Sequence, residues 1–507
     1  MLDSLSQFGA AFGTFMTPAA LVNVVWAMFV GIIIGALPGL TATMGVALMT
    51  TLTFSMPPTD AIMVLVCVYV GAIYGGSRSA ILLNIPGTPA SACSTLDGFP
   101  LARQGMAGRA MGISTSGSWL GTLFGTLCVA TMTPVLSEMA LSFKSYEFFW
   151  IAVLGVVIAG SLSGGDPLKG YIAGFLGLLV ATVGQEPHYN YQRFAYGNTD
   201  VAGGIGLLPA LVGVFGVAEV LLAMRAPAYQ AVFSKIDSVI PRIEDVTKYW
   251  RTIFRSGAIG TFIGILPGLG EDAAAWSSYA AAKRASKEKE KFGRGSIEGL
   301  MAAETGEASS VPGAIIPVLT LALPGSAPAA VLMAAFMIHG YNPGPMLMVE
   351  TPQFFYQIVA MLVIADMVKL IFGFVLVRPL LWILLVPRER LMPIVFILCT
   401  VGAFSITSRV FDIYIMLFFG LVGFILRELK FPMAPLILGL VLGDLLEKNL
   451  TRGLVLSGGD VSPFFTNPVS GVLAAITVVS ILWSIPPAQA AFRRAADGLR
   501  RRRPSAD

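Results

Sequence analysis

The chain has 507 residues, of which 55% are hydrophobic and only 12% are charged, and its formal net charge is +4. Soluble domains carry about 25% charged residues, so the composition excludes this class and indicates a polytopic membrane protein. The basic residues gather in a few stretches, which is a topology signal and not a sign of nucleic-acid binding. The 4 cysteines and 2 histidines are scattered, so we expect no metal site and no other cofactor.

The first part of the chain alternates apolar stretches with Pro-Gly breaks. Residues 18–37 are apolar and end in Gly35-Ala-Leu-Pro38-Gly39-Leu40, and 42–56 follow at once. Because Pro and Gly interrupt helices, this pair predicts a tight helical hairpin. A third stretch, 60–75, leads to Ile81-Leu-Leu-Asn84-Ile-Pro86-Gly87-Thr88-Pro89-Ala-Ser91. After a polar loop predicted over 96–109, apolar segments lie near 110–134, 147–162, 168–184 and 203–223.

The second part repeats this order after a charged connector. Gly264-Ile-Leu-Pro267-Gly268-Leu269 echoes the first hairpin turn, and a basic insert, 283–294, follows. A helix is predicted near 296–311, followed by Val318-Leu-Thr-Leu-Ala-Leu-Pro324-Gly325-Ser326-Ala-Pro328-Ala-Ala330. Further apolar segments lie near 353–386, 391–407, 410–427, 431–446 and 469–487, before a strongly basic tail.

The two long Pro-Gly motifs each predict a helix, a break and a new helix. Pro-Gly ends the apolar run, and Thr88 then suits an N-cap with Pro89 at the first helical position. Ser326 and Pro328 predict a looser version of the same restart. Broken helices at membrane depth occur where protein or water covers the freed backbone, and corresponding breaks in two halves indicate a transporter binding site.

Basic stretches stay in the cytoplasm, and their positions predict that equivalent spans, near 147–162 and 391–407, run in opposite directions. We therefore predict an all-α polytopic membrane protein of about 11–12 spans, with two inverted-topology repeats, broken helices and re-entrant hairpins. The predicted domains are a first membrane repeat (1–225), a cytoplasmic connector (226–255), a second membrane repeat (256–450), and a final span with a basic cytoplasmic tail (451–507). The N-terminus, which lacks Lys and Arg before Arg78, is predicted to lie outside.

The breaks predict a site for an anion such as a carboxylate. A helix N-terminus carries about half a positive charge and free N–H donors, so two of them meeting at midplane would hold an anion. Arg78 could pair with the carboxylate, or it could be an interfacial arginine that snorkels toward water. The predicted substrate-binding residues are Arg78, Asn84, Gly87, Thr88, Pro89, Ser91, Gly325 and Ser326.

The hairpin turns predict a cation site, because exposed carbonyls and nearby hydroxyls could hold sodium. The alternative is an ordinary turn. Acidic residues after the second turn could serve a cation site, a proton relay or a helix cap, since carboxylates in apolar regions are usually functional. Glu304 and Glu307 allow the same interpretations. The predicted cation-binding residues are Gly39, Thr41, Thr43, Gly268, Gly270, Glu271 and Asp272, with Na⁺ or H⁺ as the coupling ion.

Three stretches resemble one family: Tyr74-Gly-Gly-Ser-Arg-Ser-Ala-Ile-Leu-Leu-Asn-Ile-Pro-Gly-Thr-Pro89, Leu96-Asp-Gly-Phe-Pro-Leu-Ala-Arg-Gln-Gly105 and Leu323-Pro-Gly-Ser326. They are similar to the large membrane subunit of tripartite tricarboxylate transporters (TctA-like). The resemblance covers nearly the whole chain. Two positions depart from it: the family usually has a small or apolar residue at Arg78, and two asparagines at Ser309 and Ser310. Citrate is therefore not assumed as the substrate.

The resemblance implies a secondary-active, cation-coupled importer of tricarboxylates or related carboxylates in the bacterial inner membrane, and not an enzyme. It implies a small membrane subunit (TctB-like) and a periplasmic solute-binding protein (TctC-like) as partners, with the N-terminus periplasmic and the C-terminus cytoplasmic. An uncoupled organic-anion channel is the alternative. An intramembrane enzyme is the third hypothesis, but it would need paired aspartates or a nucleophile with a histidine, which the apolar spans do not offer.

Overall fold

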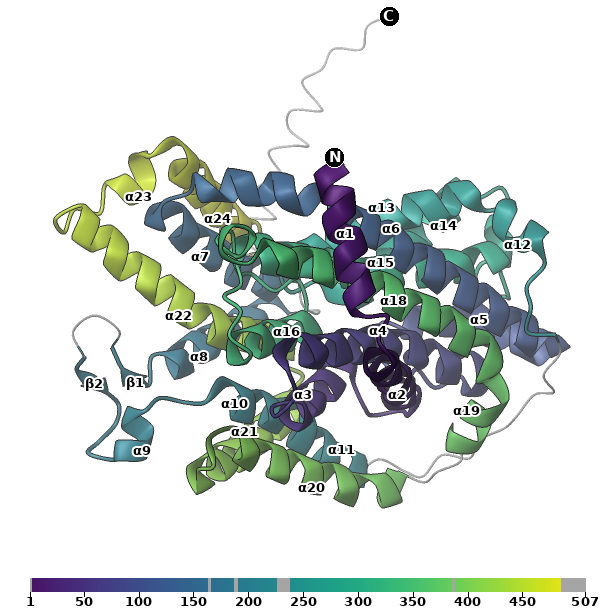
Figure 1. Ribbon diagram of the computed structural model, residues 1–507, viewed down its shortest axis with the longest axis horizontal. Helices are drawn as coiled ribbons and strands as arrows, with labels where there is room; N and C mark the ends of the chain where they lie inside the picture. Colours follow the sequence, from purple (N-terminus) through teal and green to yellow (C-terminus); the bar gives the residue numbers. More distant parts are fainter. Residues whose placement is uncertain (1, 163–165, 187–189, 226–237, 385–387, 485–507) are drawn as a thin grey trace, which may run out of the picture. The chain divides into compact units, whose positions relative to one another are not determined.

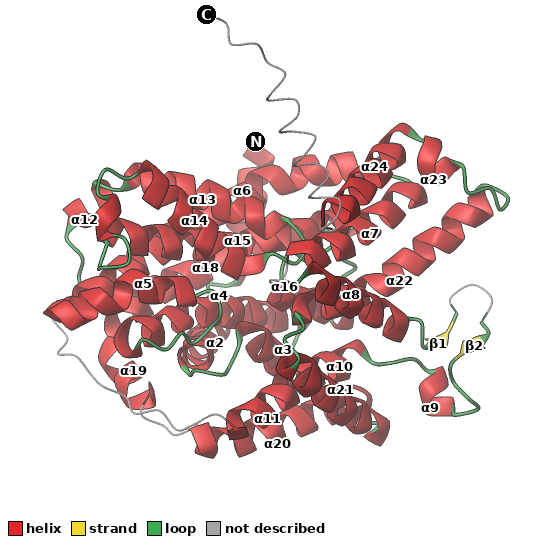
Figure 2. Ribbon diagram, turned by 180° about the vertical axis from the view of Figure 1, so that it is seen from behind, coloured by secondary structure: helices red, strands yellow, loops and turns green. Residues whose placement is uncertain are grey.

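The computed structural model describes residues 2–162, 166–186, 190–225, 238–384 and 388–484. The basic tail, residues 226–237 of the predicted connector, and Pro387 lie outside these ranges. Helices make up nearly all of the described chain (Figure 2). The described residues also include one antiparallel strand pair, β1 (Gly184–Gln185) and β2 (Gln192–Arg193), with Gly184 opposite Arg193. The predicted all-α fold class is confirmed.

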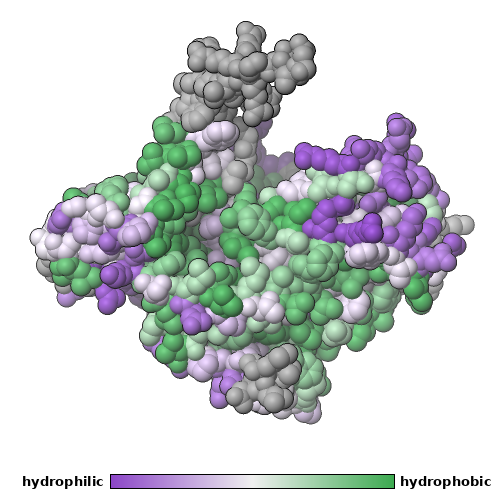
Figure 3. Space-filling model, turned by 90° about the horizontal axis from the view of Figure 1, so that it is seen from above, coloured by the Kyte–Doolittle hydropathy of each residue, from purple (hydrophilic) through white to green (hydrophobic). Residues whose placement is uncertain are grey.

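Several helices are suited to cross a membrane. Within the described residues, 6 helices are long and apolar enough to cross a membrane. They are Pro18–Ala36, Pro58–Leu83, Ala92–Leu141, Leu207–Arg225, Pro352–Val375 and Val410–Glu428. Shorter apolar helices include Ala42–Leu52 and Ala327–Ile338, which adjoin the predicted breaks. Broad apolar surfaces are visible in Figure 3, and the hydrophilic residues are densest at the right of the view. The chain is therefore a multi-pass membrane protein, and the span count of about 11–12 stays a prediction.

The chain forms two compact units, each built from two sequence segments. The first unit comprises Met1–Ser142 and Gly206–Leu429, and the second comprises Phe143–Ile205 and Lys430–Asp507. The predicted repeats, 1–225 and 256–450, follow one another along the sequence, whereas each compact unit combines two separate segments. The repeats therefore stay a prediction.

The first unit holds both Pro-Gly breaks (Figure 1). Its helices in the first segment are α1 (Leu2–Thr14), α2 (Pro18–Ala36), α3 (Ala42–Leu52), α4 (Pro58–Leu83), α5 (Ala92–Leu101), the π-helical turn η1 (Ala102–Met106) and α6 (Ala107–Leu141). Those in the second segment are α10 (Leu207–Val212), the π-helical turn η2 (Gly213–Val217), α11 (Ala218–Arg225), α12 (Ile243–Thr247), α13 (Trp250–Ile265), α14 (Gly270–Ala285), the 3₁₀ turn η3 (Lys289–Lys291), α15 (Ile297–Leu321), α16 (Ala327–Ile338), α17 (Leu347–Glu350), α18 (Pro352–Val375), α19 (Val377–Leu384), α20 (Arg388–Thr407) and α21 (Val410–Glu428).

Small residues allow helix pairs of the first unit to pack closely. α2 packs along α4, and α13 packs along α15. A Cβ at Gly31 would press on the backbone of Val68. In the second pair, a Cβ at Gly264 would press on the backbone of Ser310. Close approach through small residues is the usual way for helices to associate in lipid, where apolar burial supplies little drive.

The second unit has its own packing. It contains α7 (Ser145–Leu162), α8 (Pro167–Ala181), β1, β2, α9 (Thr199–Ala202), α22 (Met433–Leu456), α23 (Pro463–Thr466) and α24 (Pro468–Ser484). α22 packs on α7 and α8, and α24 packs on α7. The Trp150 indole N–H donates to the Phe464 carbonyl over 2.7 Å. Arg193 pairs with Glu447 of α22, and this hydrogen bond raises the pKa of Arg193 above its ordinary value.

The polar stretch predicted as a loop over 96–109 is helical instead. α5 runs to Leu101 and η1 continues to Met106, where Gly105 has a φ of 82° before α6 begins. The prediction was wrong because Asp97 is buried and bonded, so its polarity does not mark a loop.

A charged pair holds the connector next to α6. Arg109 donates to both carboxylate oxygens of Asp245 in α12, over 3.0 and 2.6 Å. Burial alone would raise the pKa of Asp245, but the hydrogen bonds and charge of Arg109 outweigh it and lower the pKa below its ordinary value. The pair thus fixes the start of the second half against α6.

Candidate functional site

The first break closes back onto its own helix. α4 ends at Leu83, and its C-cap Asn84 has a left-handed φ of 58° that turns the chain away from the helix axis. The Gly87 N–H then donates to the Gly76 carbonyl over 3.3 Å. A Cβ at Gly87 would overlap the carbonyl oxygen of Gly35, at the end of α2. Bare backbone is therefore required where the break meets the first hairpin.

The second break has the same construction. α15 ends at Ala322, whose φ of 55° is also left-handed. The Gly325 N–H donates to the Ala314 carbonyl over 3.4 Å. A Cβ at Gly325 would overlap the carbonyl oxygen of Gly264, at the end of α13. The repeat recognised in the sequence is thus a repeat of backbone conformation and of the neighbouring hairpin.

The helix restarts differ from the prediction. α5 begins at Ala92, so Thr88 is not its N-cap and Pro89 is not its first residue. Thr88 and Ser91 instead bond each other's backbone: the Thr88 N–H donates to Ser91 Oγ over 3.2 Å, and the Ser91 N–H donates to Thr88 Oγ1 over 3.3 Å. This reciprocal turn satisfies donors that a helix would otherwise leave open. The prediction failed because each hydroxyl already has a local backbone partner.

The second restart is the more regular one. Ser326 is the N-cap of α16 and accepts from the Ala329 N–H over 3.4 Å, with Pro328 in the first turn. The prediction that this restart would be looser than the first was wrong. Each restarted helix also packs on helices from the other half of the sequence. α5 packs on α15, and α16 packs on α3 and α4.

The hairpin turns lie directly against the breaks. Gly39 and Gly268 have φ values of 96° and 79°, which favour glycine. Thr41 caps α3, with its Oγ1 accepting from the Met44 N–H over 3.2 Å, and Thr43 is buried in the first turn. The Gly268 N–H donates to the Gly325 carbonyl over 3.0 Å. A residue predicted for the cation and one predicted for the substrate are therefore bonded to each other.

Tyr69 of α4 links the second break to the acidic end of α14. Its hydroxyl donates to the Glu271 carboxylate and is hydrogen-bonded to Ser326 Oγ over 2.8 Å. Gly270, with a φ of 60°, opens α14 and positions Glu271 there. Sequence reasoning found Glu271 and Ser326 but missed Tyr69, because a lone tyrosine in an apolar span carries no local signal.

Glu271 and Asp272 have different surroundings. Glu271 is buried, while Asp272 is exposed to the surface. Both occupy the first turn of α14, where the helix dipole favours negative charge. This position is consistent with the role of a helix cap, one of the three roles considered for these acidic residues. The bond from Tyr69 to Glu271 places this carboxylate next to the break as well.

Arg78 is completely buried, with 0% of its surface exposed, so the snorkelling interpretation is wrong. Its guanidinium donates to the Met111 carbonyl over 3.1 Å and to the Ser114 hydroxyl over 2.7 Å, both on α6. It also lies over the Tyr74 ring, 4.0 Å from the centroid. Arg78 is thus held inside the bundle by α4 and α6, and direct contact with a substrate stays a prediction.

The residues predicted for substrate are not all brought together. Among the hydrogen bonds of the described residues, none joins Thr88 or Ser91 to Gly325 or Ser326. Asn84 and Pro89 are exposed at the first break, whereas Gly325 and Ser326 are buried at the second. The meeting of the two helix N-termini around one anion therefore stays a prediction.

Further buried charges lie on α15 and α18. Glu304 of α15 is 2% exposed and accepts from the Ser94 hydroxyl of α5 over 2.6 Å. On α18, Asp366 and Lys369 are 2.7 Å apart and both buried. Sequence reasoning missed this pair, although two opposite charges three positions apart in an apolar span were a usable signal.

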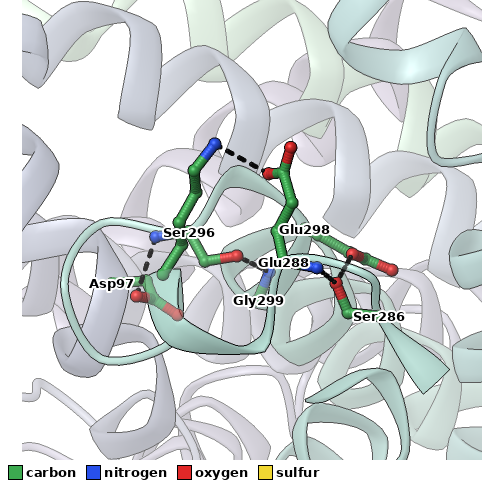
Figure 4. Close-up of polar contacts among 7 residues, drawn as sticks. Asp97, Ser286, Glu288, Ser296, Glu298 and Gly299 are labelled. Atoms are coloured by element: carbon green, nitrogen blue, oxygen red, sulfur yellow. Dashed lines mark hydrogen bonds and ion pairs between the residues drawn. The ribbon is translucent and has the colours of Figure 1, made fainter. Parts of the chain in front are cut away.

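The family-like motif around Asp97 has a structural role. Asp97 Oδ1 accepts from the backbone N–H groups of Gly293, Gly295 and Ser296, over 2.8, 2.9 and 2.8 Å. Ser296 caps α15 by accepting from the Gly299 N–H over 3.0 Å. Figure 4 shows Asp97 pointing at Ser296, with Ser286 bonded to Glu298 beside them. The motif therefore ties α5 of the first half to the start of α15.

Metal binding was not expected from the sequence. The described residues contain no group of three or more His, Cys, Asp or Glu side chains that could hold a metal ion. The four cysteines are free thiols, and three of them are buried.

Two proteins of Agrobacterium vitis are similar to this chain. A protein of Agrobacterium vitis, described as an uncharacterized 52.8 kDa protein in the TAR-I ttuC' 3'region, is 34% identical over 491 residues, which cover 96% of this chain and 97% of the relative. An uncharacterized protein in the TAR-II ttuC' 3'region of the same organism is 33% identical over 228 residues, 45% of this chain and 94% of that relative. No solved structure matches the chain. Residues 21–438 match the tripartite tricarboxylate transporter TctA family, so the resemblance is confirmed and the chain belongs to this family.

Proposed function

We propose that the chain is the large membrane subunit of a secondary-active, cation-coupled importer of tricarboxylates or related carboxylates. The observation that carries the proposal is the repeated Pro-Gly break, because each one holds a glycine backbone against the end of a neighbouring helix. Paired breaks of this kind are typical of transporter sites at the bilayer midplane. The carboxylate would replace its lost hydration with backbone N–H groups and nearby hydroxyls.

The coupling cation is proposed to act at the second break. Glu271 and Ser326 share Tyr69 as a hydrogen-bond partner. A charge on Glu271 therefore acts electrostatically on the place where the substrate would bind. A cation bound by the predicted residues Gly39, Thr41, Thr43, Gly268, Gly270, Glu271 and Asp272 would offset the substrate's negative charge there.

The family supports the proposed partners and location. Tripartite transporters work with a small TctB-like membrane subunit and a TctC-like periplasmic solute-binding protein. We propose both for this chain, in a bacterial inner membrane, with the N-terminus periplasmic and the C-terminus cytoplasmic. The inverted orientation of the two halves belongs to the same proposal. In that orientation the two breaks would approach the substrate site from opposite sides of the membrane.

Coupled transport is distinguished from a channel by accumulation. The chain is reconstituted in vesicles with both partners and offered a panel of labelled di- and tricarboxylates, with or without an inward Na⁺ or pH gradient. We expect at least one carboxylate to accumulate above its external concentration, and only when a gradient is present. Equilibration without dependence on any gradient would favour the uncoupled channel, and no uptake of any panel member would overturn the proposal.

A further inference from the structure

Glu307 is the buried carboxylate for which the described structure provides no partner. It lies in the middle of α15 and is 2% exposed. Neither of its carboxylate oxygens accepts a hydrogen bond from any described residue. Its neighbour Glu304, one turn earlier, is as deeply buried but is bonded to Ser94. Buried polar groups in folded proteins are nearly always satisfied, so an unsatisfied carboxylate indicates a role other than packing.

The charged and titratable groups around Glu307 are mostly acidic. Glu304 is on its own helix, and the charges of buried Glu271 and exposed Asp272 act on it from α14. Arg78 of α4 is a cation whose charge acts on it. Cys93 of α5 is also close enough to interact with its charge.

The other helices that pack on α15 include α6, α13 and α16. α6 approaches with Gly117 and Gly121, and α13 approaches with Gly260. On the break side, α16 begins with Ser326, which is bonded to Tyr69 of α4. The charges of three carboxylates therefore act on Glu307. The Arg78 guanidinium opposes them, but it is already bonded to Ser114 and to the Met111 carbonyl.

An ionised Glu307 would be unstable in these surroundings. A buried carboxylate without donors loses its hydration and gains nothing in return, and neighbouring like charges add to the cost. Two species could neutralise it, a metal cation or a proton. A hard metal cation needs several oxygen ligands around it. A proton needs only one carboxylate oxygen, which Glu307 supplies.

We propose that Glu307 is the proton-binding site through which this chain couples proton entry to carboxylate entry. The inference rests on the proposed function for its transport step and names H⁺ as the coupling ion. On the outer side a hydronium ion gives its proton to a Glu307 oxygen, which forms the neutral acid and leaves water. On the inner side the Glu307 O–H bond breaks and water accepts the proton.

Coupling follows from the charge at the second break. An anion bound near Ser326 would add negative charge beside Glu271 and Glu307, so it would bind better when Glu307 is neutral. By the same linkage, substrate would increase proton binding at Glu307. Substrate and proton would then cross together, because a bound anion beside an ionised Glu307 is costly at membrane depth.

Protonation is tested directly by infrared difference spectroscopy on the full-length chain, titrated with acid and base in lipid without substrate. A buried protonated glutamate gives a carbonyl stretch that shifts in heavy water. We expect wild type and Glu138→Gln, which changes an exposed glutamate of α6, to show this titrating band, and Glu307→Gln to lose it. A band that persists unchanged in Glu307→Gln would overturn the proposal.

A second variant covers the case in which Glu307→Gln does not fold. Glu307→Asp keeps a carboxyl group but moves it, so the band should remain with a displaced titration midpoint. An unchanged midpoint in Glu307→Asp would also contradict the proposal, because it would assign the band to another residue.

The transport step is tested in vesicles that hold the chain and both partners. In wild type, an inward pH gradient should drive accumulation of whichever labelled carboxylate of the panel is transported. Glu307→Gln should still exchange labelled for unlabelled substrate but should lose accumulation. Retained pH-driven accumulation in Glu307→Gln would overturn the proposal. If wild type transports no carboxylate, the proposed function fails, and the infrared titration still decides the protonation of Glu307.

Discussion

At the scale of single residues, each break depends on one glycine that cannot take a side chain. A Cβ at Gly325 would overlap the Gly264 carbonyl oxygen and press on Ala314. Overpacking of this kind costs about 1–3 kcal/mol. We therefore predict that Gly325→Ala displaces the break and lowers carboxylate uptake by about tenfold or more, since 1.4 kcal/mol corresponds to about tenfold. Uptake at matched membrane expression measures this, and Gly87→Ala should behave in the same way.

The matched control is Gly9→Ala in α1. Gly9 is exposed, and a Cβ there would meet nothing within 4 Å. Uptake should stay at the wild-type rate in this variant. If Gly325→Ala and Gly87→Ala also transport normally, the breaks are ordinary kinks and the substrate binds elsewhere.

The buried pair on α18 gives a second prediction at this scale. Asp366 and Lys369 are 2.7 Å apart, and the Lys369 ammonium also donates to Thr122 of α6 over 2.7 Å. Removing one partner of a buried pair typically costs about 3–5 kcal/mol, whereas replacing both by apolar residues is often neutral. Lys369→Met should therefore lower the melting temperature in detergent, and the double variant with Asp366→Leu should recover much of it. No recovery in the double variant would show that the two charges act independently.

The sequence predicted some site residues but not their partners. Ser326 and Glu271 could be found because each follows a local Pro-Gly signal. Tyr69 bonds both of them from 257 and 202 positions away, and no local pattern predicts such a contact. Arg78 was recognised, but its environment was not, because its partners on α6 are 33 to 37 positions away. Long-range partners are set by packing, which one sequence does not specify.

At the scale of elements, Asp97 joins α5 to the loop that opens α15. One carboxylate oxygen accepts three backbone N–H groups there. Each buried donor left without an acceptor costs about 1–3 kcal/mol. We predict that Asp97→Ala frees the basic insert, so that trypsin cleaves faster at its exposed residues Lys287, Lys289 and Lys291. Asp97→Asn should be milder because it retains one acceptor oxygen.

The control for this prediction is Asp460→Ala. Asp460 is exposed and its carboxylate bonds only within its own turn, to the Ser462 N–H over 2.9 Å and to the Ser462 hydroxyl. Cleavage of the basic insert should not change in this variant. Equal cleavage rates in wild type and Asp97→Ala would show that the insert is held by other contacts.

Most elements could be predicted, and the errors have a common cause. Apolar length located α2 and α21 closely, because α2 ends just before a Pro-Gly pair and α21 ends at charged residues. The stretch over 96–109 and the restart at Thr88 were mispredicted because polar residues there are buried and bonded to backbone. Polarity predicts a loop only when the side chains are solvated.

At the scale of the whole molecule, sequence and comparisons agree on a multi-pass membrane protein of the TctA family. The repeated hairpin and break are visible in the backbone of both halves, at Gly87 and at Gly325. Their opposite orientation in the membrane rests on the distribution of basic residues, which is a property of loops and termini.

The measurement that tests the proposed function most directly is carboxylate uptake by the reconstituted chain with each partner left out in turn. The chain, a TctB-like subunit and a TctC-like binding protein are combined in vesicles with an imposed ion gradient, and initial rates are measured with labelled carboxylates. We expect uptake with all three components and loss of uptake when the binding protein or the small subunit is absent. Full-rate uptake by this chain alone, or no uptake by the complete system, would contradict it.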